Sequence, residues 1–488
     1  MTSVRRALLF SLLERYALTV LAFASNVLLA RLLTPSEIGV YSVCMAVVGI
    51  AGVLREFGIG SYLIQKREVT RAHLGTAFGL SLVMGVLLFA VLFLAAGPVA
   101  RFYGDDRLVL VTQVVAVNFL TLPFCTISMA MLRREMRFKA VLWANVIAAA
   151  AGFVVTVGGA LLGWGALSMA VGSIVTNLVV GFCTWWVRRA DGWVRPVFSE
   201  WRDVLHFGGQ TTLSNTVGTI AMNANDLAVG RLLGLDAVAM ISRAMGLMNL
   251  YHRDLMAAVR NVALPGFAAG AREGADVAAA ELRAVSVITV VGWSFYAFVS
   301  VFALDVVRLL FGDQWDSAAP LVPLFCLGGA IAALNAVTPQ RLIATGHVGV
   351  VTRLELLIHP LRIVVILGAL VVWPEMSTVA WVFIGSAVFG VLLYRRAVHR
   401  LAPMSLRRYL GMLMRSAAVA AAFVLPALLV RLLLGAAEGE HGVPVLTACA
   451  VGGAMLAMLT GYMVRHPLLE EPWVQGLMRR LPVSAAGR

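Results

Sequence analysis

Charged side chains interrupt several long apolar stretches of this sequence, and they are the first candidates for chemistry. Glu14 and Arg15 lie in the first stretch, and Arg55 and Glu56 lie late in the second. A charge inside a lipid bilayer is costly unless it is paired or hydrated, so such residues often mark ion or substrate pathways. If the two stretches form neighbouring antiparallel helices, the four charges share one depth and form a neutral cluster. The alternative is that they snorkel to the membrane boundary and serve only to hold helices together.

A second group of charges occurs in the second half of the chain. Asp226 lies late in one apolar stretch and Arg243 early in the next, so both are expected in the same half of the membrane. We predict that this pair forms and breaks as two helical bundles rock about a central cavity. A static pair that joins two helices is the alternative. Arg253 and Asp254 follow, and they repeat the basic-acidic order seen in the first half.

These charges belong to two similar segments of the chain. A shift of 200 residues superposes Arg31 on Arg231 and brings Asn26 opposite Asp226, which follows Asn225. In each copy, an apolar helix with a polar residue near its end is followed by an Arg-Leu-Leu loop and a second apolar helix. Internal repetition of this kind is typical of transporters. Asn26 and Asn225 therefore join the four arginines as candidate substrate-binding residues, and the four carboxylates are candidates for gating or coupling.

The composition indicates a membrane protein. Hydrophobic residues make up 60% and charged residues 13% of the 488 positions, whereas about 25% charged is usual for soluble domains. The net charge of +14 does not indicate nucleic-acid binding, because the basic residues cluster in short loops between apolar stretches. The first apolar stretch is too long for a cleavable signal peptide and is expected to remain as a helix.

Runs of about twenty apolar residues, the length that crosses a bilayer, predict fourteen transmembrane helices in an all-α polytopic membrane protein. With the N-terminus in the cytoplasm, 28 of the 39 Lys and Arg residues fall on the cytoplasmic side and six on the other, which predicts that both termini are cytoplasmic. The predicted parts are two six-helix bundles, an interfacial linker, two additional helices and a cytoplasmic tail. Their expected bounds are 1–190 and 204–400 for the bundles, 191–203 for the linker, 401–465 for the additional helices and 466–488 for the tail.

Signatures of enzymes and cofactor sites are missing from the sequence. It has no phosphate-binding glycine loop, no clustered His and Cys ligand set and no carboxylate pair on a large outer loop. The five cysteines all lie in apolar stretches, where they act as small hydrophobic residues. We therefore expect neither an enzyme nor a metal or cofactor site, and a membrane-bound polymerase or glycosyltransferase is disfavoured.

Several short motifs resemble the polysaccharide transporter branch of the MATE-like flippase superfamily, which contains the O-antigen and exopolysaccharide flippases. The resemblance covers roughly residues 5 to 350 and is local but distributed. It departs from the family at Ala239-Met240-Ile241, where members usually carry glycine and aromatic residues. The motifs are Glu14-Arg15, Leu29 to Gly39, Leu63 to Lys66, Leu132 to Lys139, Asn225 to Gly234, Ser242-Arg243-Ala244, and Leu310 to Trp315 with Ala319-Pro320.

This resemblance implies a flippase of the bacterial inner membrane. Its substrate would be a polyprenyl-diphosphate-linked oligosaccharide, moved from the cytoplasmic to the periplasmic leaflet by alternating access for exopolysaccharide, O-antigen or capsule synthesis. Membrane lipids, a polysaccharide polymerase and a co-polymerase are the partners that it implies. The in-span arginines fit a diphosphate, because arginine suits bidentate phosphate contacts.

Two related functions remain as alternatives at this point. A cation-coupled drug or metabolite antiporter of the same superfamily would favour acidic residues in its cavity, and the in-span charges alone do not exclude it. A lipid II flippase with fourteen helices is the other. Glu14, Glu56 or Asp226 could bind a proton or Na⁺, although a carboxylate paired with arginine normally stays ionised.

Overall fold

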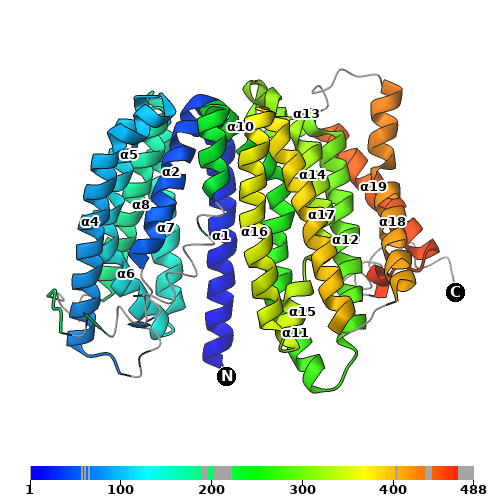
Figure 1. Cartoon of the computed structure of the whole chain (residues 1–488), viewed down its shortest axis with the longest axis horizontal. Helices are drawn as coiled ribbons and strands as arrows, with labels where there is room; N and C mark the ends of the chain where they lie inside the picture. The colour runs from blue at the N-terminus through cyan, green and yellow to red at the C-terminus, as the bar shows by residue number, and fades with distance from the viewer. Residues whose placement is uncertain are drawn as a thin grey trace. The chain divides into compact units, whose positions relative to one another are not determined.

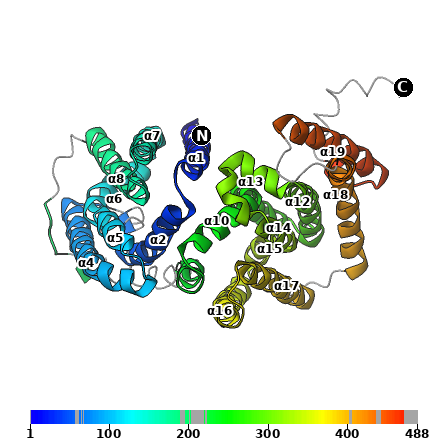
Figure 2. The ribbon, with the colours of Figure 1, turned by 90° about the horizontal axis from the view of Figure 1, so that it is seen from above.

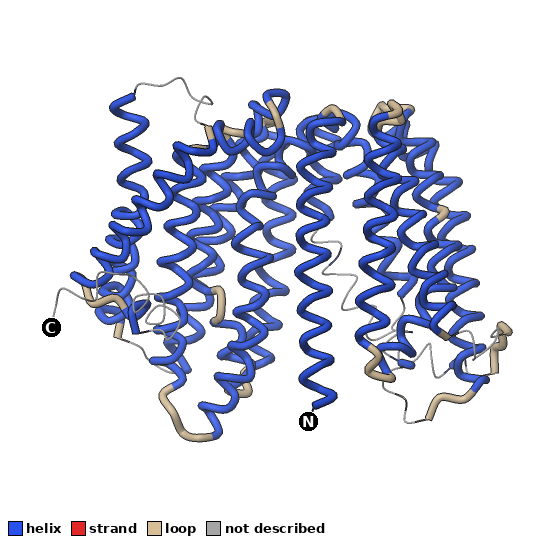
Figure 3. The backbone as a smooth tube through the Cα atoms, turned by 180° about the vertical axis from the view of Figure 1, so that it is seen from behind, coloured by secondary structure: helices blue, strands red, loops and turns tan. Residues whose placement is uncertain are grey.

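The computed structural model is built from helices, and Figure 3 shows no strand in the part of the chain that it describes. The described residues are 2–56, 59, 62–63, 66, 68–188, 195–199, 201–202, 219, 223–401, 405–434 and 442–470. Among them, 12 helical segments are long and apolar enough to cross a membrane. The prediction of an all-α polytopic membrane protein is confirmed. The count of fourteen stays a prediction, because much of the expected seventh helix lies outside the described residues.

The chain forms two compact units, Met1–Ala239 and Met240–Arg488. The predicted linker at 191–203 and the predicted tail lie largely outside the described residues, so the predicted domain bounds stay predictions. In unit 1 the helices are α1 (Thr2–Leu32), α2 (Pro35–Glu56), α4 (Arg71–Tyr103), α5 (Arg107–Ala116), α6 (Asn118–Arg134), α7 (Phe138–Leu161) and α8 (Ala166–Val187). Residues 223–232 are also helical, and α10 (Leu235–Asn249) begins at the end of this unit.

Unit 2 continues from α10 through a π-helical segment, η2 (Leu250–Leu255), and then forms helices separated by short turns (Figure 1). These are α11 (Met256–Arg272), α12 (Val277–Val301), α13 (Ala303–Phe311), η3 (Asp313–Ala318), α14 (Leu321–Ala332), η4 (Ala333–Asn335), α15 (Thr338–Ala344), α16 (Val348–Val372), α17 (Met376–Leu401), α18 (Leu406–Leu434), α19 (Val443–Met463) and η5 (Pro467–Glu470).

The Thr-Pro-Ser-Glu motif found by sequence is a helix start. The Thr34 hydroxyl accepts a hydrogen bond from the Glu37 backbone N–H at 3.3 Å, and the Glu37 carboxylate accepts one from the Thr34 N–H at 2.8 Å. This reciprocal capping satisfies two backbone donors that a helix start leaves unpaired. Pro35 occupies the first helical position, where its missing N–H costs nothing.

Gly39, which ends the Leu29 to Gly39 motif, allows two segments of unit 1 to meet. A Cβ placed on Gly39 would lie 2.0 Å from the carbonyl oxygen of Leu235, so only glycine lets the start of α2 approach the start of α10 so closely. These two positions belong to the two similar segments of the sequence. The similarity therefore has a structural counterpart, since their helix starts are in contact.

Neighbouring helices within each unit pack in ways that chain order only partly predicts. In unit 1, α1 packs along α7, and α7 packs along α8 (Figure 2). In unit 2, α18 packs against both α12 and α19, and the contact between them includes Phe302, Ala427 and Cys449. The two predicted additional helices therefore attach to unit 2 through α12. Large side chains such as Val154 and Leu432, which are 66% and 81% exposed, fit a lipid-facing surface.

Candidate functional site

The clearest candidate site in unit 2 surrounds Arg243 of α10. This arginine is buried, with 8% of its surface exposed. Its guanidinium carbon lies 4.9 Å from the centre of the Trp315 ring and 5.3 Å from that of Phe311. A cation over an aromatic face is attracted by the ring quadrupole, and the attraction is strongest where water is excluded. The aromatic residues of the Leu310 to Trp315 motif therefore hold the arginine that the sequence singled out.

A tight turn presents the two rings to the same arginine. Gly312 separates α13 from η3 and has φ of +100°, a conformation that favours glycine. An ion pair spans the turn, with Arg308 Nη2 2.6 Å from Asp316 Oδ2. The hydrogen bond from Arg308 lowers the pKa of the Asp316 carboxyl below its usual value, so this pair keeps its charges at neutral pH. Gly312 and the Arg308–Asp316 ion pair thus fix the positions of Phe311 and Trp315.

The second pair of candidates in unit 2, Arg253 and Asp254, lies in the π-helical segment η2. A single π-helical turn widens the backbone and occurs frequently at functional sites. Nearby, the Tyr251 hydroxyl donates a hydrogen bond to the Ile288 carbonyl at 2.5 Å and so anchors this segment to α12. The side chains of Arg253 and Asp254 are outside the described ones, and their substrate-binding and gating roles stay predictions.

In unit 1 the structure gives Glu14 a partner that the sequence did not suggest. Asn145 of α7 donates a hydrogen bond to Glu14 at 2.6 Å, because α1 packs along α7. Arg15 is exposed on the same helix. The side chains of Arg55 and Glu56, in the last turn of α2, are outside the described ones. The predicted cluster of four charges therefore stays a prediction.

The polar residues near the Arg-Leu-Leu loops differ in their surroundings. Asn26 is exposed on α1. The side-chain oxygen of Asn225 is buried and has no hydrogen-bond partner among the described residues, which leaves an acceptor for a donor on a bound molecule. Asp226 is half-buried beside it in unit 1. Arg243 belongs to unit 2, so the predicted pair of Asp226 and Arg243 stays a prediction.

Among the described residues, a membrane-length span is interrupted in each unit. In unit 1 the span 107–134 breaks at Val117, between α5 and α6, and in unit 2 the span 321–344 breaks at η4, between α14 and α15. Asn118 follows the first break, where it donates to Ser173 at 2.8 Å and accepts from Asn177 at 2.6 Å. Broken helices at matching positions in two halves are a pointer to the transport pathway.

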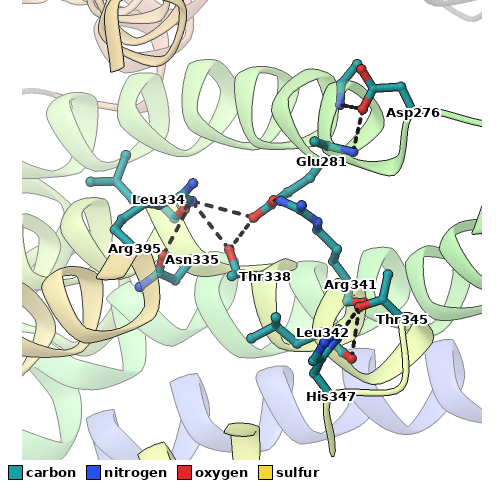
Figure 4. Close-up of polar contacts among 12 residues, drawn as sticks. Asp276, Glu281, Leu334, Asn335, Thr338, Arg341, Leu342, Thr345, His347 and Arg395 are labelled. Carbon is teal, nitrogen blue, oxygen red and sulfur yellow. Dashed lines mark hydrogen bonds and ion pairs between the residues drawn. The ribbon is translucent and has the colours of Figure 1, made fainter. Parts of the chain in front are cut away.

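Sequence reasoning missed a buried polar network at the second break (Figure 4). Glu281 of α12 is fully buried and accepts hydrogen bonds from Arg341 and, at 2.6 Å, from Thr338 of α15. Arg395 of α17 lies 3.6 Å from Glu281 Oε1, the oxygen that accepts from Thr338. Its guanidinium also sits 4.3 Å from the Tyr409 ring of α18. Glu281 thus joins α12, α15 and α17, and Arg395 extends the network to α18.

In the sequence, Arg341 and Arg395 count as cytoplasmic loop charges that only set the membrane orientation. Arg341 and Arg395 were assigned to cytoplasmic loops by the Lys and Arg count, yet Arg341 is only 5% exposed. Glu281 lies two positions before Arg283, and two charges so close together at the start of an apolar stretch suggest a loop. A usable signal was its place four residues before Val285, on the buried face of α12.

Comparison with known proteins identifies the family. The profile of the polysaccharide biosynthesis protein family matches residues 28–320, which is more than half of the chain. The chain belongs to this family. The match includes Arg243, Phe311 and Trp315 and ends at Pro320, so the aromatic site lies inside it.

Curated relatives share about a quarter of their residues or less with this chain. The Bacillus subtilis teichuronic acid biosynthesis protein TuaB is 22% identical over 410 residues, which cover 83% of this chain and 84% of the relative. The Escherichia coli lipopolysaccharide biosynthesis protein WzxC is 22% identical over 68% of each chain. The Rhizobium meliloti succinoglycan biosynthesis transport protein ExoT is 25% identical over 67% of each.

Solved structures show the same fold. The lipid II flippase MurJ in an inward closed conformation matches with a TM-score of 0.72 at 11% identity, over 97% of this chain and 100% of that one. An inward-facing multidrug resistance MATE transporter matches with a TM-score of 0.64 at 16% identity, over 80% and 96%. At these identities the comparison concerns the fold alone.

Proposed function

We propose that the protein is a flippase that moves polyprenyl-diphosphate-linked oligosaccharides from the cytoplasmic to the periplasmic leaflet by alternating access. Family membership over residues 28–320 carries this proposal. The relatives are named for teichuronic acid, lipopolysaccharide and succinoglycan, all of them polysaccharides. In this proposal the chain is a transporter rather than an enzyme.

The chemistry of Arg243 supports an anionic substrate. The rings of Phe311 and Trp315 lower the cost of burying this cation. A diphosphate offers the acceptors that a guanidinium pairs with most strongly. In our proposal Arg15, Arg55, Arg243 and Arg253, with Asn26 and Asn225, contact the headgroup. Glu14, Glu56, Asp226 and Asp254 contribute to the gates or to coupling.

In this proposal the protein lies in the bacterial inner membrane. Both termini are in the cytoplasm, as the Lys and Arg distribution predicts. It delivers repeat units to a polysaccharide polymerase and co-polymerase. The interrupted helices at Val117 and η4 lie where each bundle can bend as it changes its accessible side.

The test is a leaflet assay in cells that lack the gene. Lipid-linked repeat units are extracted, and their access to an external lectin is measured in spheroplasts. We expect complete repeat units to accumulate on the inner leaflet, and the wild-type gene to restore export. Arg15→Gln and Arg243→Gln should not restore it at equal protein levels.

Arg353→Gln is the matched control, because Arg353 is an exposed arginine on α16 outside the proposed site. It should restore export fully. Normal glycolipid levels and unchanged surface polysaccharide in the deletion strain would contradict the flippase function. Loss of resistance to cationic drugs in that strain would instead favour an antiporter.

A further inference from the structure

Unit 2 carries a groove that the predicted site does not include. It lies between α16 and α17 and encloses about 690 Å³, within the range of about 300–1,000 Å³ typical of ligand pockets. Its walls are mostly apolar and include Leu361 and Val365 of α16 and Trp381 and Phe389 of α17. One arginine, Arg362, lines it as well. An apolar channel with a single cation is the shape and chemistry that suit an anionic amphiphile.

Arg362 lies too deep in its helix to reach water along the groove walls. It is 14 residues from Val348 and 10 from Val372, or roughly 21 Å and 15 Å from the two helix ends at about 1.5 Å per residue. Both spans exceed the length of an arginine side chain, so snorkelling to the boundary is not available. A charge at this depth requires a counter-charge or a hydrated cavity.

The nearest acid on its own helix is already engaged. Glu355 lies 2.5 Å from the His359 ring and accepts a hydrogen bond from the Tyr394 hydroxyl at 2.6 Å. Arg362 makes no hydrogen bond or close ion pair with any of the described residues, and it interacts with the Glu355 charge at longer range, two turns along the helix. The acid that lines the groove, Glu375, follows Trp373 just beyond the end of α16. Arg362 therefore presents a positive charge to the groove.

Resting on the function proposed above, we propose that Arg362 binds the diphosphate of the lipid-linked substrate as the headgroup crosses the bilayer midplane. The isoprenoid chain lies along the apolar walls of α16 and α17. The depth of Arg362 distinguishes the lipid-linked substrate from an ordinary phospholipid. Phospholipid phosphates stay at the bilayer surface, about 15 Å from the centre of a ~30 Å hydrocarbon core. Only a headgroup in transit brings a phosphate to the level of Arg362.

The experiment measures binding to the full-length protein in phosphatidylcholine nanodiscs. The probe is a polyprenyl diphosphate without sugars that carries a diazirine on its chain, and a matched polyprenol lacks only the diphosphate. For Arg362→Gln we expect about tenfold weaker binding of the diphosphate, the scale of one lost charge-assisted contact. Binding of the polyprenol should not change. Arg362→Lys should restore part of the affinity.

A second variant tests the groove without touching the charge. Gly385 lines the groove, and a Cβ there would meet no atom within 4 Å, so Gly385→Leu should fill the channel without distorting the helix. It should weaken both probes equally. Arg353→Gln, on the exposed face of the same helix, should leave both unchanged. Labelled peptides should come from α16 and α17.

Three outcomes would overturn the inference. Arg362→Gln could bind the diphosphate as tightly as the wild type, it could lose both probes equally, or phosphatidylglycerol could compete as well as the diphosphate. The leaflet assay keeps these outcomes apart from the parent proposal. Wild-type export together with unchanged binding by Arg362→Gln would remove the groove site alone, whereas absence of export by the wild type would remove the flippase function.

Discussion

The guanidinium of Arg243 faces the ring of Trp315 at 4.9 Å, and the two residues are 72 positions apart in the chain. This contact explains why an arginine can be buried in a membrane protein and still keep its charge. The ring face lowers the cost of removing the cation from water. The contact also links α10 to the turn between α13 and α14.

Removal of the Trp315 ring should weaken both the fold and the site. Trp315 is fully buried, so Trp315→Ala should lower the free energy of unfolding by about 3–5 kcal/mol through the cavity it leaves. Trp315→Phe keeps an aromatic face and should lose much less stability and retain export. Thermal unfolding in detergent and the leaflet assay would measure the two effects. Trp164→Ala is the control, because Trp164 is 47% exposed; equal losses at the two positions would contradict this account.

Substitution of the buried Glu281 should lower the free energy of unfolding about as much as substitution of Trp315. Glu281→Gln leaves Arg341 without its ion pair in a buried place, and such a break costs about 3–5 kcal/mol. Replacement of both residues, Glu281→Gln with Arg341→Gln, removes both charges and should cost less than the sum of the two single changes. A double-mutant cycle on unfolding measures this coupling.

The exposed Glu273 provides the control for this cycle. Glu273→Gln should change stability by less than about 0.5 kcal/mol, as is usual for surface positions. Additive losses for Glu281 and Arg341 would show that the ion pair in Figure 4 contributes no coupling.

Sequence alone could predict the class of fold and the unusual residues, but not their partners. The apolar periodicity predicts helices because it depends on neighbours three and four positions apart. The contact of Arg243 with Trp315 depends on long-range packing, and nothing local encodes it. The motif from Leu310 to Trp315 was noticed through family resemblance, and its physical role became visible only when α13 and η3 were placed beside α10.

The count of Lys and Arg on each side of the membrane also failed to identify the buried charges of the Glu281 network. A count of Lys and Arg treats every boundary charge as solvated, so Arg341 and Arg395 were read as loop residues. The break at η4 turns α15 so that Arg341 points at Glu281. Pro339 in the first turn of α15 marks a helix start in the sequence, but it does not show that Glu281, 58 positions earlier, is the partner of Arg341.

The crossing of α7 and α8 should reject even one methyl group. A Cβ on Gly172 would lie 1.8 Å from the Thr156 hydroxyl oxygen and 3.0 Å from the Gly152 carbonyl. Gly172→Ala should therefore lower stability by about 1–3 kcal/mol, the usual effect of overpacking. Gly158→Ala on α7 is the matched control, since its Cβ would meet nothing within 4 Å. It should be neutral or slightly stabilising because alanine favours helix; unfolding of the two variants in detergent would show whether they differ in this way.

A buried histidine should make the stability of unit 2 depend on pH. His466 follows α19 and is 2% exposed, and its Nε2 lies 3.0 Å from the hydroxyl oxygens of both Ser286 and Ser416. Burial, assisted by the nearby charge of Arg415, lowers the pKa of His466 to about 4. The unfolded chain, with a histidine pKa near 6.5, binds a proton that the folded chain rejects. Stability is therefore fully present above about pH 6.5 and is lost as pH falls toward about 4.

Thermal unfolding of the wild type in detergent should show a lower Tm at about pH 5 than at about pH 7, within the window set by these two pKa values. His466→Gln keeps a neutral side chain that can reach the two serines, so its Tm should depend less on pH. His399→Gln, at an exposed position near the end of α17, should retain the wild-type dependence. If His466→Gln and the wild type lose stability in parallel as the pH falls, the acid sensitivity comes from other groups, and the contacts of His466 with α12 and α18 serve only to hold the chain end in place.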